Sequence, residues 1–161
     1  MKNLNLTAKI QIYSYDELNP EEKKLIDCAK DACSRAYAPY SQFQVGVAAS
    51  LANGEIVTGS NQENVAFPSG LCAERTALFY ANSQYPDQAV KALAVAAYTQ
   101  GDFIDRPVSP CGACRQVILE TEMRYKTPVR ILLYGKSEIY IMEGINNLLP
   151  LAFNEIVTSD K

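Results

Sequence analysis

Two short cysteine-containing runs hold the residues of this chain that are best able to do chemistry. The first is Cys72-Ala73-Glu74 and the second is Pro110-Cys111-Gly112-Ala113-Cys114. Together they offer three sulfur ligands and one carboxylate, in a chain of 161 residues without histidine. Such a chain cannot build a Ser-His-Asp triad, a Cys-His pair or a histidine metal site. Catalysis must therefore use cysteine, glutamate, aspartate, lysine, arginine, tyrosine or a bound metal.

The spacing of the cysteines favours a catalytic zinc site. Cys111 and Cys114 are three residues apart at an expected helix start, which places both side chains on one face of the first turn. Cys72 also stands at an expected helix start, where the positive end of the helix favours thiolate over thiol. Three sulfurs bind zinc tetrahedrally and leave the fourth position open. A redox pair and a structural zinc module with a fourth ligand remain as alternatives.

Glu74 favours the catalytic alternative because it lies two residues from a candidate ligand. A carboxylate beside a zinc-bound water can take the proton of that water and pass it on. Three thiolates make the site negative, which weakens zinc as a Lewis acid. We expect the neighbouring Arg75 and the helix ends to offset this charge by donating to the sulfurs.

Composition and charge exclude several classes of function. The chain has 15 basic and 18 acidic residues, for a net charge of -3, and it shows no basic stripe of the kind that grips nucleic acid. It contains no apolar run of the ~18 residues that cross a bilayer. The first 15 residues lack the apolar core of a signal peptide, so we expect a cytoplasmic protein that binds neither nucleic acid nor membrane.

The length predicts one domain over residues 1–161, with an N-terminal extension over 1–18 and a C-terminal tail over 154–161. Five cysteines without an export signal argue against a disulfide framework. We expect Cys28 and Cys33 to be small apolar residues of the first helix.

Hydrophobic periodicity and turn signals indicate an alternation of helices and strands. Asn19-Pro20 begins a helix that continues through Ala36 and stops before Pro39. Asn53-Gly54 marks a hairpin. The expected fold is α/β, with three α/β/α layers and a mixed central sheet of about five strands. The further expected elements are strands 43–51, 55–61, 91–98, 129–134 and 138–142 and helices 71–83 and 111–123.

Several motifs, in this order, resemble the small homotetrameric cytidine deaminases with a three-cysteine zinc site. Zinc deaminases of nucleobases carry H-x-E and P-C-x-x-C, and cysteine can replace the histidine. The resemblance extends from about residue 20 to residue 153. The motifs that carry it are APYSQFQVG (38–46), NQEN (61–64), CAERTA (72–77), SPCGACRQ (109–116) and LLP (148–150).

The resemblance implies a role for each matching residue. Cys72, Cys111 and Cys114 would bind one zinc ion per chain, Glu74 would shuttle protons, and Arg75 would support the ligands. The substrate contacts implied are Asn61 and Glu63 on the ribose hydroxyls, Phe43 near the substrate, and Phe153 over the base of a neighbouring subunit.

The implied reaction is hydrolytic deamination of cytidine and 2′-deoxycytidine to the uridines and ammonia, in pyrimidine salvage. It would use a zinc-activated water and would take place in a homotetramer with composite active sites. An antibiotic deaminase of the blasticidin-S type shares the cysteine motifs, but the 61–64 run favours a nucleoside. Two positions depart from the family: Phe67 stands where tyrosine is frequent, and Val65 stands where alanine is usual.

Overall fold

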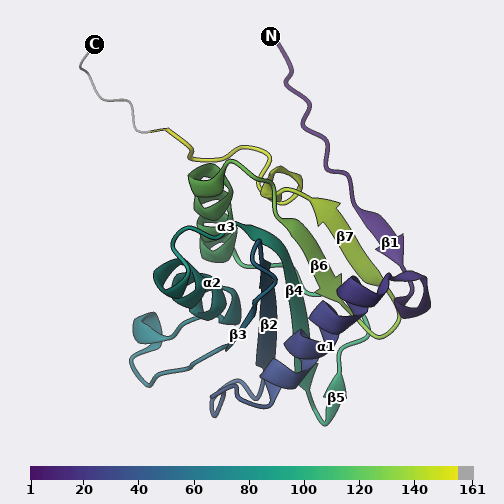
Figure 1. The fold of residues 1–161 in the computed structure, drawn as a ribbon, viewed down its shortest axis with the longest axis vertical. Coiled ribbons are helices and arrows are strands. Elements are labelled where there is room, and N and C mark those ends of the chain that lie inside the picture. Colours follow the sequence, from purple (N-terminus) through teal and green to yellow (C-terminus); the bar gives the residue numbers. More distant parts are fainter. Residues whose placement is uncertain (156–161) are drawn as a thin grey trace.

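A mixed seven-stranded sheet forms the centre of the computed structural model, which describes residues 1–155 (Figure 1). The strand order is β1-β7-β6-β4-β2-β3, with β5 paired to β4. Strands β4 and β6 are parallel, and the other pairs are antiparallel. The strands are β1 (Gln11–Tyr13), β2 (Gln44–Leu51), β3 (Ile56–Ser60), β4 (Val90–Thr99), β5 (Asp102–Phe103), β6 (Arg130–Tyr134) and β7 (Ile139–Glu143).

The five strands expected from the sequence are confirmed as β2, β3, β4, β6 and β7. The structure adds β1 and β5, which span three and two residues. Neither was predicted, because so few residues do not define an alternating pattern. β1 lies inside the N-terminal extension, which therefore contributes to the sheet.

Three helices pack on the sheet: α1 (Pro20–Cys33), α2 (Ala73–Gln84) and α3 (Gly112–Tyr125). The predicted start of α1 is confirmed, since Asn19 Oδ1 accepts a hydrogen bond from Glu22 N at 2.9 Å and Glu22 Oε2 accepts from Asn19 N at 3.1 Å. The predicted end was too late. α1 ends at Cys33, and Ala36 belongs to a turn in which its N–H donates to the Cys33 carbonyl.

The helices lie on opposite faces of the sheet, which confirms three layers (Figure 1). Side chains alternate along β2, so that Val47 and Ala49 pack with α2 and α3 whereas Ala48 packs with α1. Short 3-10 helices connect the elements: η1 (Tyr15–Glu17), η2 (Phe67–Ser69) and η3 (Ile145–Asn147).

Gly59 on β3 allows α2 to approach the sheet closely. A Cβ atom at Gly59 would lie 2.5 Å from the nitrogen of Ala77 and 2.8 Å from the carbonyl oxygen of Ala73. Any larger residue would push α2 away from the sheet. The position of α2, and of the cysteine and glutamate at its start, therefore depends on this glycine.

Two further expectations from the sequence concern the C-terminal tail and membrane-spanning segments. Most of the expected tail over 154–161 lies outside the described residues, which end at 155. Within residues 1–155, no helix has both the length and the apolar character to cross a membrane.

Candidate metal and active site

Three cysteine sulfurs converge where α2 and α3 begin. Cys72 caps the start of α2, Cys111 caps the start of α3, and Cys114 lies in the first turn of α3. The sulfur of Cys111 is 3.7 Å from that of Cys72 and 3.4 Å from that of Cys114. All three sulfurs lie within 4.8 Å of one another.

This geometry fits zinc. Zn–S bonds of about 2.3 Å in a tetrahedron place neighbouring sulfurs about 3.8 Å apart, close to the separations seen here. Cys114 is fully buried, Cys72 is half-buried and Cys111 is exposed, so the cluster lies at the border between core and solvent. The three sulfurs would hold a zinc ion and leave one coordination position open.

The surroundings of the cysteines already favour one thiolate. Hydrogen bonds from the Cys114 thiol, from Arg75 and from Cys111 lower the pKa of Cys72 to about 5, although burial opposes the shift. The pKa of Cys114 is raised, first by its hydrogen bond to Cys72 and then by burial. Cys72 is therefore the sulfur that this site keeps ionised most readily.

Glu74 lies beneath the cluster, in the first turn of α2, with only 5% of its surface exposed. Burial raises the pKa of its carboxyl, and the charge of Cys72 adds to this, while hydrogen bonds to its own backbone N–H and to Cys114 act in the opposite direction. The structure thus places the predicted proton carrier against the predicted ligands. A buried carboxyl at this place can hold a proton near a metal-bound reactant.

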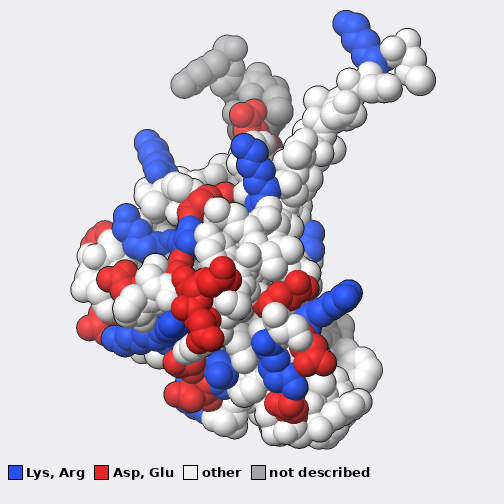
Figure 2. All heavy atoms as spheres, turned by 90° about the vertical axis from the view of Figure 1, so that its right-hand side faces the viewer, with Lys and Arg blue, Asp and Glu red and all other residues white. Residues whose placement is uncertain are grey.

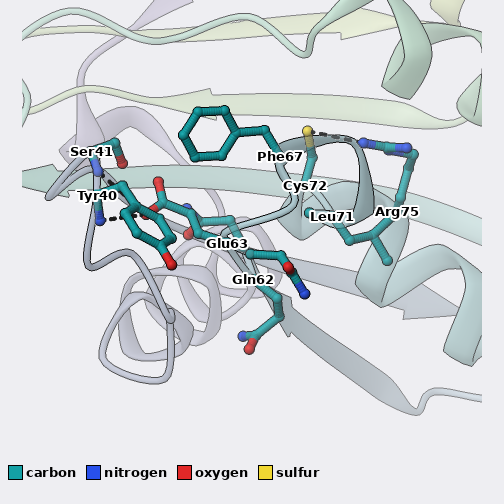
Figure 3. A pocket seen from close by; sticks show the side chains of 11 residues that line it. Tyr40, Ser41, Gln62, Glu63, Phe67, Leu71, Cys72 and Arg75 are labelled. Atoms are coloured by element: carbon teal, nitrogen blue, oxygen red, sulfur yellow. Dashed lines mark hydrogen bonds between the residues drawn. The ribbon is translucent and has the colours of Figure 1, made fainter.

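Arg75 follows Glu74 and reaches back to the cluster. Its Nη2 atom donates to the sulfur of Cys72 at 3.5 Å (Figure 3). Its Nε atom is buried and has no hydrogen-bond partner among residues 1–155. The guanidinium therefore supplies positive charge to the sulfur ligands, and one of its donors remains unused.

A cleft of about 590 Å³ opens beside Cys72, which is a typical size for a small-molecule site. Figure 3 shows Glu63 and Tyr40 on one side of it and Cys72 with Arg75 on the other. Among the predicted site residues, Asn61, Glu63, Cys72 and Arg75 line the cleft. The remaining lining comes from Tyr40, Ser41, Gln62, Asn64, Phe67, Gly70 and Leu71.

Asn61 and Glu63 hold the backbone of this cleft together. The Asn61 amide accepts from Val45 N at 2.7 Å and donates to the Phe43 carbonyl at 2.9 Å. Glu63 accepts from Tyr40 N at 2.8 Å and from Ser41 N at 3.3 Å. Both bonds to Glu63 use Oε2, so Oε1 can accept a hydrogen bond from a ligand.

The aromatic residues occupy different positions. Phe43 is half-buried and is not part of the cleft lining, and Phe153 is 71% exposed. Phe67 lines the cleft, and its ring forms a T-shaped pair with the ring of Tyr40 at a centroid distance of 5.8 Å. Val65 is 78% exposed and does not belong to the lining, so it does not narrow this cleft.

Arg115 is a positioning residue that the sequence did not single out. Its Nε atom donates to the Pro110 carbonyl at 2.8 Å, and its Nη1 atom donates to the Leu148 carbonyl at 2.7 Å. It thereby joins the cysteine loop to the C-terminal segment. Gln116 extends this link by donating to the Phe153 carbonyl at 2.7 Å. Both residues lie in the 109–116 motif, but only the folded chain brings their partners close.

Comparison with known proteins decides the family. The model of the cytidine and deoxycytidylate deaminase zinc-binding region matches residues 19–128, more than half of the chain. The chain belongs to this family. The resemblance drawn from the sequence motifs is thereby confirmed, and with it the expectation of a cytidine deaminase, a zinc aminohydrolase, as the class of enzyme.

Cytidine deaminases of several bacteria are similar to this chain. The cytidine deaminase of Halalkalibacterium halodurans is 47% identical over 135 residues, which cover 83% of this chain and 94% of that protein. That of Sporosarcina psychrophila is 52% identical over 98 residues, covering 61% of this chain and 68% of that protein. The crystal structure of cytidine deaminase from Burkholderia pseudomallei is similar in fold, with a TM-score of 0.70 and 37% identity over 84% of this chain and all of that one.

Proposed function

We propose that this chain hydrolytically deaminates cytidine and 2′-deoxycytidine to uridine and 2′-deoxyuridine, with release of ammonia, in pyrimidine salvage. One observation carries the proposal: the buried carboxyl of Glu74 lies next to Cys72 and Cys114 in the cluster of three sulfurs, and Cys72 lines a cleft that presents Asn61 and Glu63. Bacterial cytidine deaminases are similar to this chain over most of their own length. Family membership and site chemistry therefore favour the same reaction.

The three cysteines would hold one zinc ion per chain. Zinc bound there supplies the Lewis acidity that makes a water molecule nucleophilic near neutral pH. The donor set suits this ion, because soft thiolates at tetrahedral separations select zinc over magnesium or calcium. Arg75 keeps Cys72 in its thiolate form by donating to its sulfur.

Glu74 carries the protons of the reaction. Its carboxylate takes a proton from the attacking water and delivers it to the ring nitrogen next to the amino-bearing carbon. That carbon becomes electrophilic and accepts the water oxygen. Glu74 then passes the second proton to the amino group, which leaves as ammonia. One carboxylate near both sites of proton demand is sufficient, so the absence of histidine from the chain is no obstacle.

Asn61 and Glu63 orient the sugar in this proposal. The Glu63 Oε1 atom can accept from a ribose hydroxyl, while Oε2 stays bound to the backbone at Tyr40 and Ser41. The Asn61 amide uses one acceptor site for Val45 N and one donor for the Phe43 carbonyl, so that one donor and one acceptor site remain for the sugar. Phe43 does not line the cleft of this chain, so its contact with the substrate stays a prediction.

We further propose a homotetramer with composite active sites. Phe153 is 71% exposed within a single chain and can therefore cover the base in a neighbouring subunit. Other large apolar side chains are exposed on the same chain and support burial between subunits. They include Val65, Phe67, Phe79 and Tyr80.

The test is turnover of cytidine by zinc-loaded protein, followed through ammonia release and the ultraviolet change, with the Glu74→Ala and Glu74→Gln variants alongside. Glu74→Gln preserves the volume of the buried side chain. We expect both variants to retain zinc and to lose at least ~10²–10⁴ in kcat. Near-full turnover by either variant would refute the proton path. If the parent protein binds one zinc ion but turns over neither cytidine nor deoxycytidine, the proposed substrates are wrong.

A further inference from the structure

The N-terminal arm, which we define as residues 2–13, has the pattern of a long β-strand. Apolar residues stand at every second position from 4 to 12. The remaining positions of the arm are polar, except for Tyr13 at its end. This alternation gives one apolar and one largely polar face when the arm is extended. The apolar positions are symmetric about Ala8, with Leu4 and Leu6 on one side and Ile10 and Ile12 on the other.

The folded chain leaves the apolar face of this arm uncovered. Leu4, Leu6, Ile10 and Ile12 are 78%, 49%, 43% and 63% exposed. Figure 1 shows the part of the arm that precedes β1 extending away from the body of the molecule. The family region begins only at residue 19, so the arm lies outside the part shared with the deaminase family model. An uncovered apolar stripe on an extended segment is typical of a strand that pairs with another chain.

The outer edge of β1 is free to accept such a strand. β1 stands at one end of the strand order, and within residues 1–155 it pairs only with β7. Lys9 N donates to Asn147 Oδ1 at 2.8 Å, on the β7 side of the arm. Because backbone groups alternate along a strand, the N–H and C=O groups of Ile10 and Ile12 point to the free edge. No proline or glycine blunts this edge, since residues 2–13 contain neither.

We propose that the arm pairs with the arm of a second copy of this chain, antiparallel and about a two-fold axis at Ala8. In this register Leu4 of one copy lies opposite Ile12 of the other, and Leu6 opposite Ile10. Every apolar residue then meets an apolar residue, and the polar residues meet on the other face. The free backbone groups of Ile10 and Ile12 would find partners in the second copy. The contact is the same on both copies, as two-fold symmetry requires.

Charge along the segment also favours an antiparallel second copy. The arm carries Lys2 and Lys9 and no acid, whereas η1, directly after it, carries Asp16 and Glu17. Antiparallel pairing brings the basic end of one copy toward the acidic η1 of the other. It also places Lys9 opposite Thr7, so that no like charges face each other. Figure 2 views the side of the molecule that carries β1 and shows acidic and basic side chains interspersed on the body below the projecting arm.

The extent of the pairing is sufficient to join two sheets. Residues 4–12 of each copy would pair over about 30 Å, since a strand rises about 3.3 Å per residue. The pairing would continue the sheet of one copy, at its β1 edge, into the sheet of the other. A strand pair embedded between two sheets is far more stable than an isolated hairpin.

The first test measures particle mass by light scattering and sedimentation over a range of concentrations. The full chain is compared with the double variant Leu6→Ser/Ile10→Ser, which removes apolar groups from the pairing face. The matched control is Asn5→Ser/Thr7→Ser, on the opposite face of the same arm. We expect the apolar-face variant to have half the mass of the parent at low concentration, and the control to keep the mass of the parent.

The second test determines the register. With the two-fold axis at Ala8, the Ala8→Cys positions of two copies lie within the about 4.4–6.8 Å that a disulfide needs. The Thr7→Cys positions lie two residues out of register and on the other face. We expect mild oxidation to cross-link the Ala8→Cys chain into covalent dimers at a yield at least tenfold above that of Thr7→Cys, with the parent chain as background.

Equal masses of parent and apolar-face variant would overturn the inference, as would equal cross-linking of the two cysteine variants. Co-sedimentation of the full chain with anionic phospholipid vesicles, at equal mass of the parent and the apolar-face variant, would also overturn it. The apolar face of the arm would then bind a lipid surface. None of these measurements needs turnover, so the outcome is independent of the proposed reaction.

Discussion

The Nη2 atom of Arg75 donates to the sulfur of Cys72 across 3.5 Å. This contact holds a cation against a ligand of a site with three thiolates. Arg75→Gln keeps much of the side-chain length but removes the charge, and we expect it to weaken zinc binding about 10–100-fold. Competition with a coloured chelator measures the affinity. Arg75→Lys should lose less, and an unchanged affinity in Arg75→Gln would show that the arginine does not support the ligand.

Glu63 provides a test of substrate contacts. Glu63→Gln retains an oxygen that can accept from Tyr40 N, but it removes the charge from the free Oε1 position. A hydrogen bond to a charged group contributes about 1.5–3 kcal/mol, so we expect KM for cytidine to rise about 10–100-fold with a smaller change in kcat. Steady-state kinetics gives both constants. A large loss in kcat at unchanged KM would place Glu63 in the chemical step instead.

Removal of zinc should expose the accessible cysteine ligands. Metal-bound thiolates of Cys72 and Cys111 react slowly, and chelation should release these two as additional reactive thiols per chain, counted with a chromogenic disulfide, whereas Cys114 is fully buried. Cys33 is an internal control, because burial raises the pKa of its thiol to about 11 and only 3% of its surface is exposed. An equal number of reactive thiols before and after chelation would contradict ligation by cysteine.

Gly59→Ala should damage both the fold and the site. The added Cβ would lie 2.5 Å from the Ala77 nitrogen, and displacement of α2 should cost about 1–3 kcal/mol of unfolding free energy and reduce zinc binding. The matched control is Gly112→Ala, between two of the ligands, where a Cβ meets no atom within 4 Å. Urea unfolding of both variants measures the difference. Equal stability of the two would show that α2 can move without penalty.

Glu122 gives a pH-dependent prediction away from the site. Its Oε1 accepts from Val129 N at 2.8 Å and from Ile145 N at 2.9 Å, and burial raises the pKa of its carboxyl above 4.5. The raised pKa means that ionisation opposes folding. The stabilising contribution of the protonated group is full below 4.5 and is lost as the pH rises through the folded pKa.

Glu122→Gln cannot ionise and can still accept both hydrogen bonds. Its unfolding free energy relative to the parent should therefore rise between about pH 4 and about pH 7. Glu122→Leu should lose about 1–3 kcal/mol for each N–H left without a partner. Urea unfolding at both pH values measures these differences. A difference between parent and Glu122→Gln that does not depend on pH would contradict the shift.

Local sequence determined the elements and the chemistry of this protein. The capping pair Asn19 and Glu22, the Asn53-Gly54 turn and the apolar runs of β4 and β6 set helices and strands through contacts between near neighbours, and these were predictable. The cysteine spacing likewise predicted a zinc site, because a three-residue separation at a helix start places two sulfurs on one face.

Only the tertiary structure decided how distant segments meet. It brought Cys72 to Cys111 across 39 positions, linked Arg115 to Leu148, placed Glu63 against the backbone of residues 40–41, and left the edge of β1 free. It also ended α1 at Cys33, before the predicted end at Ala36. Such relationships depend on the order and register of strands and on the close approach of α2 at Gly59, and local periodicity contains neither kind of information.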